Sequence, residues 1–186
     1  MAGKMKTYVA LLRGINVGGK NVIPMADLRK CLESTGVRDV STYIQSGNVL
    51  LRSTIGTNKR LVAKLESALS KAFSYSARAV VVEKDEYCQM VAAAHNGWGE
   101  KADQKHNAMF LVDRLDAAEF LADLPEPRKS VDTVSTAKSV IFWSAKQAKI
   151  AQSSMLKVAK AKEYKMMTVR NHKTTRKLIE LLENYN

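Results

Sequence analysis

The 186-residue sequence predicts an α+β fold made of two tandem βαββαβ halves with additional helices. Two observations support this prediction. Apolar runs rich in β-branched and aromatic residues, which are typical of strands, alternate with runs whose apolar residues recur every three or four positions, as on one face of a helix. The same order of runs occurs before and after a polar stretch at residues 95–106. We therefore expect two halves that share topology but no visible sequence similarity.

The first half, residues 1–94, follows this order from its first apolar run. Residues 7–13 (TYVALLR) have the composition of a strand. Pro24 suits the first position of a helix, and Gly36 suits the position just past its end. Two short strands in residues 39–53 form a predicted hairpin. The remaining elements of this half are an amphipathic helix capped by Asn58, a buried strand at 78–83 and a helix at 85–94.

The second half, residues 107–186, repeats the pattern after a predicted linker at 95–106. A strand at 108–113 (AMFLVD) precedes a short helix for which Asp116 is a suitable N-cap. The remaining elements are a hairpin at 130–143, a helix within 146–160, a strand at 166–169 and a terminal helix at 171–183. A βαββαβ order is that of ferredoxin-like units, so we predict two ferredoxin-like halves.

The net charge of +12 is distributed unevenly along the chain. Residues 1–80 and residues 127–186 each carry 13 Lys/Arg and 4 Asp/Glu, whereas residues 81–126 carry 4 Lys/Arg and 10 Asp/Glu. This pattern favours a positive surface on one side of the protein. Such a surface either binds a polyanion or only aids solubility, and the sequence leaves both interpretations open.

Several classes of protein are disfavoured by the composition. No run approaches the roughly 18 apolar residues of a membrane span, and the N-terminus lacks the pattern of a signal peptide. We therefore expect a cytoplasmic protein with no membrane partner. Cys31 and Cys88 suggest neither a disulfide framework nor a metal site. The three histidines look isolated and lack the spacing of metal ligands, so we predict no metal and no cofactor; they are His95, His106 and His172.

A glycine-rich loop, RGINVGGKN, follows the first strand. Its GxxxxGK spacing matches a phosphate-binding loop, but Asn21 replaces the Ser/Thr that would hold Mg²⁺, and the helix starts only near Pro24. A weaker interpretation is a concavity of backbone N–H groups that binds an anion. The glycines are equally explained by a sharp turn. The candidate binding residues of this loop are Arg13, Gly14, Asn16, Gly18, Gly19, Lys20 and Asn21.

Two further polar clusters interrupt apolar runs. The QSGN stretch at the predicted hairpin tip offers amide donors beside the loop, although a plain turn also explains it. At the start of the last helix, an arginine and a capping asparagine would face an anion together with free backbone N–H groups; ordinary capping is the alternative. The candidate residues of the two clusters are Gln45, Ser46, Gly47, Asn48, Arg170, Asn171 and Thr174.

Three segments together resemble the bacterial domain-of-unknown-function 1697 family: LLRGINVGGKN with IPMADLR, YIQSGNVL, and TVRNHKTTRKL. The resemblance spans residues 7–182 and implies an α+β fold with two ferredoxin-like halves. It implies no activity, but it places all fourteen candidate residues at signature positions of the family. Members of the family often have a tryptophan where this chain has His172.

The leading hypothesis for function is binding of a phosphorylated or polyanionic ligand, with nucleic acid as one candidate partner. The cations of separate segments, above all Arg13 and Arg170, would then meet in one anion-binding pocket. The first alternative is an enzyme acting on a small phosphorylated metabolite, for which no general base is visible in the sequence. The second alternative is a scaffold that self-associates through its acidic and basic segments.

Overall fold

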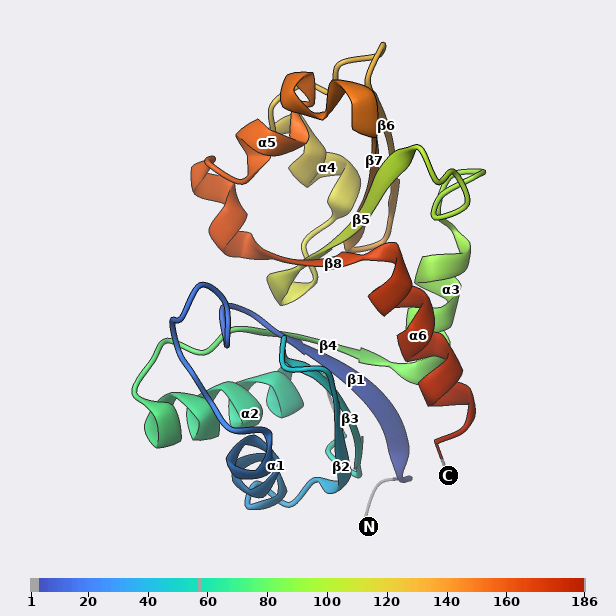
Figure 1. Cartoon of the computed structure of the whole chain (residues 1–186). Helices are drawn as coiled ribbons and strands as arrows, with labels where there is room; N and C mark the ends of the chain where they lie inside the picture. The colour runs from blue at the N-terminus through green and yellow to red at the C-terminus, as the bar shows by residue number, and fades with distance from the viewer. Residues whose placement is uncertain (1–3, 57, 186) are drawn as a thin grey trace. The chain divides into compact units, whose positions relative to one another are not determined.

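The computed structural model describes residues 4–56 and 58–185 as an α+β protein with two four-stranded antiparallel sheets (Figure 1). The chain divides into two compact units. The first unit contains the described residues up to Tyr87 together with those from Leu178 onward, and the second unit is Cys88–Lys177. No helix in the described residues is long and apolar enough to cross a membrane.

The first sheet has the strand order β2-β3-β1-β4. Its elements, with the helix that follows them, are β1 (Lys6–Leu12), α1 (Met25–Glu33), β2 (Arg38–Tyr43), β3 (Asn48–Ser53), α2 (Asn58–Phe73), β4 (Ala79–Glu83) and α3 (Lys84–Ala92). The βαββαβ order predicted for this half is confirmed. The side chain of Asn58, predicted as a helix cap, donates from Nδ2 to the Val81 carbonyl at 2.5 Å and so ties α2 to β4.

The second sheet has the equivalent order β6-β7-β5-β8. Its strands are β5 (Gln104–Leu111), β6 (Asp132–Ala137), β7 (Val140–Lys146) and β8 (Met167–Asn171). The connecting helices are α4 (Ala117–Ala122), α5 (Met155–Val158), α6 (His172–Glu183) and the short 3₁₀ helices η1 (Val112–Arg114), η2 (Gln147–Gln152) and η3 (Lys162–Met166). The two halves thus share a topology.

Two elements of the second half differ from the prediction. Strand β5 begins at Gln104, inside the predicted linker, because pairing with β7 extends the ladder to Gln104 opposite Lys146. The helix predicted within residues 146–160 is only the four residues of α5, preceded by η2. Asp116 caps α4 as predicted, accepting hydrogen bonds from the N–H groups of Ala118 and Glu119. The prediction that the two halves are separate domains, with limits at 1–94 and 107–186, stays a prediction.

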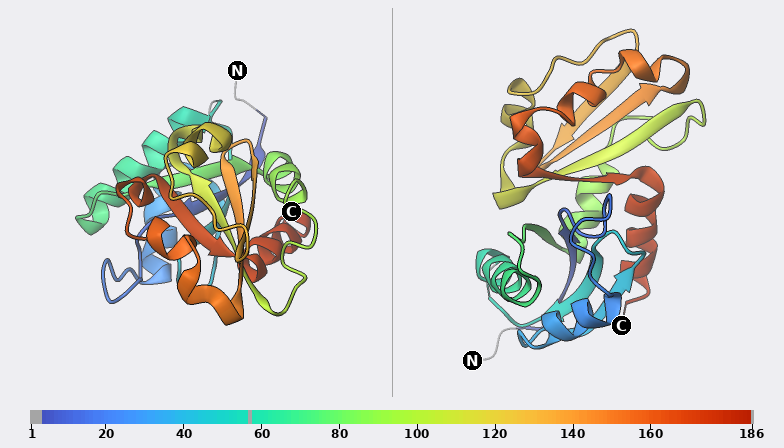
Figure 2. Two further views of the ribbon diagram at one scale, coloured as in Figure 1. Left: turned by 90° about the horizontal axis from the view of Figure 1, so that it is seen from above. Right: turned by 60° about the vertical axis from the view of Figure 1, so that its left-hand side comes forward.

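The core of the first unit lies on both faces of its sheet. Figure 2 shows α1 and α2 along one face, where Leu28, Leu32, Leu61, Leu65 and Leu69 are fully buried. The neighbouring residues Val9, Ala10 and Leu11 of β1 are also fully buried, although consecutive strand residues point to opposite faces. The opposite face is therefore covered as well, and residues of the C-terminal segment belong to this unit. Leu178 and Leu182 are fully buried, and the Tyr185 hydroxyl donates to the Leu50 carbonyl at 3.1 Å.

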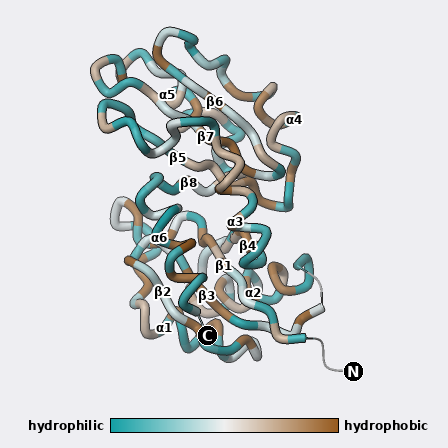
Figure 3. Tube along the Cα trace, turned by 90° about the vertical axis from the view of Figure 1, so that its right-hand side faces the viewer, coloured by the Kyte–Doolittle hydropathy of each residue, from teal (hydrophilic) through white to brown (hydrophobic). Residues whose placement is uncertain are grey.

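The second unit has its own core. Trp143 and Ile141 of β7 pack with Met109 and Leu111 of β5 against residues of α4 and α5. In Figure 3, hydrophilic residues (teal) concentrate in the connecting segments around the sheets. The polar positions singled out in the sequence lie mainly at strand ends and in these connections.

Gly47 occupies a position that demands glycine for two reasons, and this yields a prediction. Its φ is +75°, and a Cβ there would lie 2.8 Å from Leu12 Cβ. We expect Gly47→Ala to lower the free energy of unfolding of the first unit by about 2–4 kcal/mol through strain and overpacking. Denaturant unfolding measures the loss. The control is Gly18→Ala, since Gly18 also has positive φ but open space around it; an equal loss there would contradict the steric argument.

Candidate functional site

The glycine-rich loop forms a small hairpin. Val17 and Lys20 make an isolated antiparallel bridge, in which the Lys20 N–H donates to the Val17 carbonyl at 3.1 Å. The two central residues, Gly18 and Gly19, have φ of +58° and +73°, which glycine adopts without strain. Helix α1 begins only at Met25. The loop therefore lacks the direct connection from lysine to helix on which a phosphate-binding loop of nucleotide hydrolases depends.

Two asparagines hold this hairpin in shape. The Asn16 side chain accepts a hydrogen bond from the Ile23 N–H at 2.7 Å and donates to the Ile23 and Gln45 carbonyls at 3.0 and 2.9 Å. The Asn21 side chain donates to the Gly14 carbonyl at 2.7 Å. Both asparagines have positive φ, which Asn tolerates better than most residues. The bond to Gln45 brings the glycine loop and the β2–β3 turn together. A binding site shared by the two segments stays a prediction.

The β2–β3 turn is held in a similar way. The Gly47 carbonyl accepts a hydrogen bond from the Leu12 N–H at 2.7 Å. The fully buried Asn48 donates from Nδ2 to the Tyr43 carbonyl and to Ser46 Oγ, both at 3.1 Å. These contacts give Gly47 and Asn48 a structural role in the turn. Their predicted role as ligand-binding residues stays a prediction.

One cation remains exposed at the hairpin tip. Within the described part of the chain, the Lys20 ammonium has no hydrogen bond or ion pair, and the Gly18 and Gly19 N–H groups donate to no acceptor. The apolar side chains of Val17 and Val22 on the same loop, and of Ile44 before the β2–β3 turn, are also exposed, to 61%, 73% and 50%. The tip can offer an anion one ammonium and two backbone donors.

The third predicted cluster lies in the second unit. Asn171 caps α6 as predicted, since its Oδ1 accepts a hydrogen bond from the Thr174 N–H at 2.8 Å. Arg170 is buried, and its Nη1 donates to Thr168 Oγ1 at 2.8 Å and to the Val169 carbonyl at 2.9 Å. Arg13 and Arg170 belong to different compact units. A pocket shared by these two arginines therefore stays a prediction.

The three histidines, predicted to be isolated, form one cluster in the second unit, so that prediction is wrong. Ser144 Oγ lies 2.9 Å from His95 Nε2 and 2.7 Å from His106 Nδ1. The rings of His106 and His172 are in edge contact with centroids 5.4 Å apart. The sequence could not show this cluster, because its members come from a connecting segment, β5 and α6 and meet only through the sheet.

The hydrogen bonds of this cluster have a definite direction. The Lys101 carbonyl, 3.0 Å from His106 Nε2, can only accept, so that nitrogen carries a proton. In the neutral ring, His106 Nδ1 then accepts from the buried Ser144 hydroxyl, whose oxygen accepts from His95 Nε2–H. His95 Nδ1 is left to accept from Ser135 Oγ at 3.1 Å. With one proton on each ring, every ring nitrogen of His95 and His106 has a hydrogen-bond partner in this series.

Trp98 completes the cluster. It is 3% exposed, and its ring makes edge contacts with Phe142 and His172 at centroid distances of 5.0 and 6.3 Å. His172, which stands where family members often have tryptophan, therefore keeps a ring contact. No group of three or more His, Cys, Asp or Glu residues among those described is arranged to hold a metal ion.

A set of exposed cations lies on the segment before β6 and on the segment between β7 and β8. Arg128 and Lys129 precede β6, and further lysines follow on the segment from the end of β7 to η3. Seven of these side chains are exposed and make no ion pair or hydrogen bond with any described residue: Arg128, Lys129, Lys146, Lys149, Lys157, Lys160 and Lys165. We call them the α5 cations. The only other charged groups of residues 139–165 are Lys162 and Glu163, which pair at 3.7 Å.

The buried Asp132 connects the two segments that carry the α5 cations. Its carboxylate accepts hydrogen bonds from the Arg128 N–H at 2.9 Å, the Ser154 N–H at 3.0 Å and Ser153 Oγ at 2.5 Å. Burial by itself would raise the pKa of Asp132, but these hydrogen bonds to the charged form lower it overall. Asp132 therefore stays ionised and fully engaged at neutral pH.

The histidine cluster makes stability depend on pH. Burial lowers the pKa of His95 and of His172, helped by His106 and by nearby Lys101, Lys173 and Arg176. The unfolded chain then binds more protons near pH 6.5, so we expect the free energy of unfolding to fall as the pH drops from about 7.5 to 5.5. Denaturant titrations across this range measure the trend. His172→Gln, which cannot titrate, should show a shallower slope; unchanged or rising stability on acidification would contradict the assignment.

Asn16 gives a second prediction. Asn16→Asp keeps the acceptor for the Ile23 N–H and the tolerance of positive φ, but it removes both donors and turns a carboxylate toward two carbonyl oxygens. We expect a loss of about 1–3 kcal/mol in the stability of the loop, measured by amide hydrogen exchange of Ile23. Asn21→Asp removes a single donated bond and is the matched comparison. A loss at Asn16 no larger than at Asn21 would contradict the central role of Asn16.

Comparisons with known proteins agree with this architecture. The structure is similar to the solved structure of a conserved bacterial protein from Streptococcus pneumoniae, with a TM-score of 0.85 and 28% sequence identity over 96% of this chain and 99% of that chain. No curated protein matches the chain. The family described as "Protein of unknown function (DUF1697)" matches residues 5–142. Since this match covers well over half of the 186 residues, the chain belongs to the DUF1697 family.

Proposed function

We propose that this protein binds a phosphate-containing polyanion, with single-stranded nucleic acid as the candidate ligand, through the α5 cations. The observation that carries the proposal is that seven exposed cations, on two segments connected by Asp132, have no carboxylate partner among the described residues. Surface cations that serve only solubility are usually interspersed with acids. Unpaired cations in one region attract phosphates and release their counterions, which is the main source of affinity in nonspecific nucleic-acid binding.

The glycine loop adds a second, smaller contact in this proposal. Lys20 and the N–H groups of Gly18 and Gly19 point to no acceptor in the described chain, and Asn16 and Asn21 keep the hairpin in shape without using these donors. One ammonium and two amides suit a single phosphate. The enzyme and the scaffold stay alternative predictions, and no contact described above favours either over binding.

We also propose a more specific description of the fold of each half. In each sheet the first strand lies between the third and the fourth, all neighbours are antiparallel, and the elements run in the order βαββαβ. We infer that each half is a ferredoxin-like unit. In the second half, the short α5 with its flanking 3₁₀ helices takes the place of the second long helix, and this segment carries four of the α5 cations.

Salt dependence tests the proposal directly. We expect the affinity for a short single-stranded RNA to fall steeply between about 50 and 200 mM salt, with a log–log slope of about −0.7 for each phosphate contacted. The double variant Lys160→Met/Lys165→Met should make this slope shallower by about 1.4. Fluorescence anisotropy titrations at several salt concentrations give the slopes.

The matched control removes two exposed lysines of α2 in the first unit, as Lys64→Met/Lys71→Met. This variant loses the same net charge and should keep the slope of the wild type. Affinity that stays flat with salt, or equal changes in both double variants, would overturn the proposal.

A further inference from the structure

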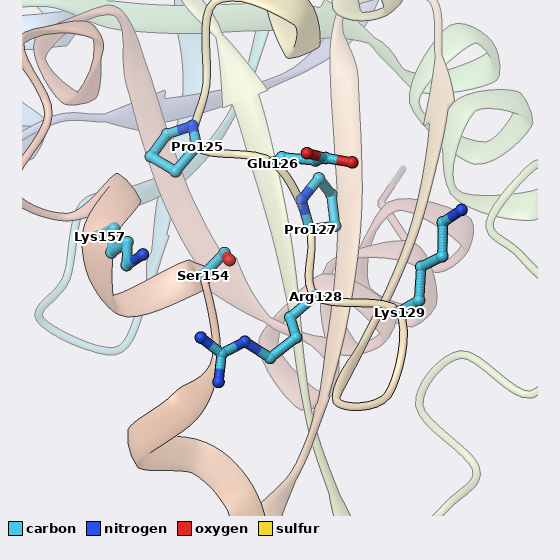
Figure 4. Close-up of a pocket in the computed structure, with 7 residues that line it drawn as sticks. All are labelled: Pro125, Glu126, Pro127, Arg128, Lys129, Ser154 and Lys157. Carbon is cyan, nitrogen blue, oxygen red and sulfur yellow. The ribbon is translucent and has the colours of Figure 1, made fainter.

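A hollow of about 510 Å³ lies between the segment that follows α4 and the start of α5, within the second unit (Figure 4). Its volume is in the range of pockets that hold small ligands. The lining residues are Pro125, Glu126, Pro127, Arg128, Lys129, Ser154 and Lys157. Three of these residues are α5 cations, so the surface that carries these cations is concave at this hollow.

Ser154 is the unusual member of this lining. It is only 5% exposed, yet its hydroxyl makes no hydrogen bond with any described residue and does not cap α5. Figure 4 shows the Ser154 oxygen pointing into the space between α5 and the Pro127–Arg128 segment. A group that enters the hollow would therefore meet a hydroxyl that makes no hydrogen bond with the described residues.

Two cations flank this hydroxyl. Figure 4 shows the Lys157 ammonium to the left of Ser154 and the Arg128 guanidinium below it, whereas the ends of Glu126 and Lys129 point away from it. Neither Arg128 nor Lys157 forms an ion pair with the described residues. An arginine fork can bind two oxygens of one phosphate, and a lysine supplies a compact second charge.

The walls of the hollow are fixed relative to one another. The Asp132 carboxylate accepts hydrogen bonds from the backbone N–H groups of Arg128 on one wall and Ser154 on the other. The Arg128 carbonyl is also engaged, since it accepts hydrogen bonds from the N–H groups of Val131 and Asp132 at 2.8 and 2.7 Å. The Asp132 carboxylate is thus already hydrogen-bonded to donors of both walls. Because the walls are held in place, the cavity needs little reorganisation on binding.

We propose that this hollow binds a phosphate monoester, such as the terminal phosphate of a nucleic acid or of a small metabolite. The Arg128 fork binds two phosphate oxygens, and Ser154 and Lys157 bind the third. A monoester carries a charge of about −1.5 to −2 near neutral pH, which two cations match, whereas a phosphodiester carries a single charge. This proposal rests on the polyanion binding proposed above, because it specifies which kind of phosphate group of such a ligand is bound.

The experiment compares one short RNA with a 5′-phosphate and with a 5′-hydroxyl. We expect the wild type to bind the phosphorylated form about tenfold more tightly, as charged hydrogen bonds of this kind provide. Arg128→Gln, Ser154→Ala and Lys157→Met should each reduce that preference. The matched control is Lys160→Met, which removes an α5 cation outside the hollow and should weaken both RNAs equally. Thermal melts confirm that each variant folds.

A second readout uses inorganic phosphate alone, followed through the amide resonance of Ser154. Equal binding of both RNAs by the wild type, or a preference that survives all three pocket variants, would overturn the monoester site and leave polyanion binding intact. If neither RNA binds but phosphate shifts the Ser154 amide in the wild type and not in Arg128→Gln, the site stands and the polyanion proposal fails. No shift of this amide together with no 5′ preference overturns the site.

Discussion

The structure depends on one constraint: the central strands of both sheets are apolar on both faces, so both faces must be covered. In β1, consecutive residues that point to opposite faces, Val9 to Leu12, are all buried to 1% exposure or less. Helices α1 and α2 cover one face of this sheet, and Leu178, Leu182 and Tyr185 belong to the same unit. The first unit is therefore completed by the last residues of the chain.

Most asparagines and aspartates described above lie at strand ends or in loops, where they satisfy the backbone of neighbouring segments. Asn16 joins two loops, Asn171 caps α6, and Asp132 joins the segment before β6 to the start of α5. These residues position the surface, and the binding that we propose uses side chains that have no partner within the described chain.

The candidate binding groups differ from the structural ones in a simple way. Ser154, Arg128 and Lys157 make no side-chain hydrogen bond within the described chain, whereas Asn16, Asn21 and Asn48 use their side-chain amides on nearby backbone carbonyls. Unpaired cations repel one another, and a bound phosphate would relieve this repulsion.

The sequence by itself determined the α+β class, the repeated βαββαβ order, the caps at Asp116 and Asn171 and the sharp turns at the glycines, because these follow from local periodicity and backbone preference. It also located the basic segments. Only the tertiary structure decided which polar groups are satisfied: it brought three distant histidines together, engaged Asn16 and Asn48 within loops, and left Ser154 unpartnered beside Arg128. Such partners come from segments far apart in the chain, and local patterns carry no information about them.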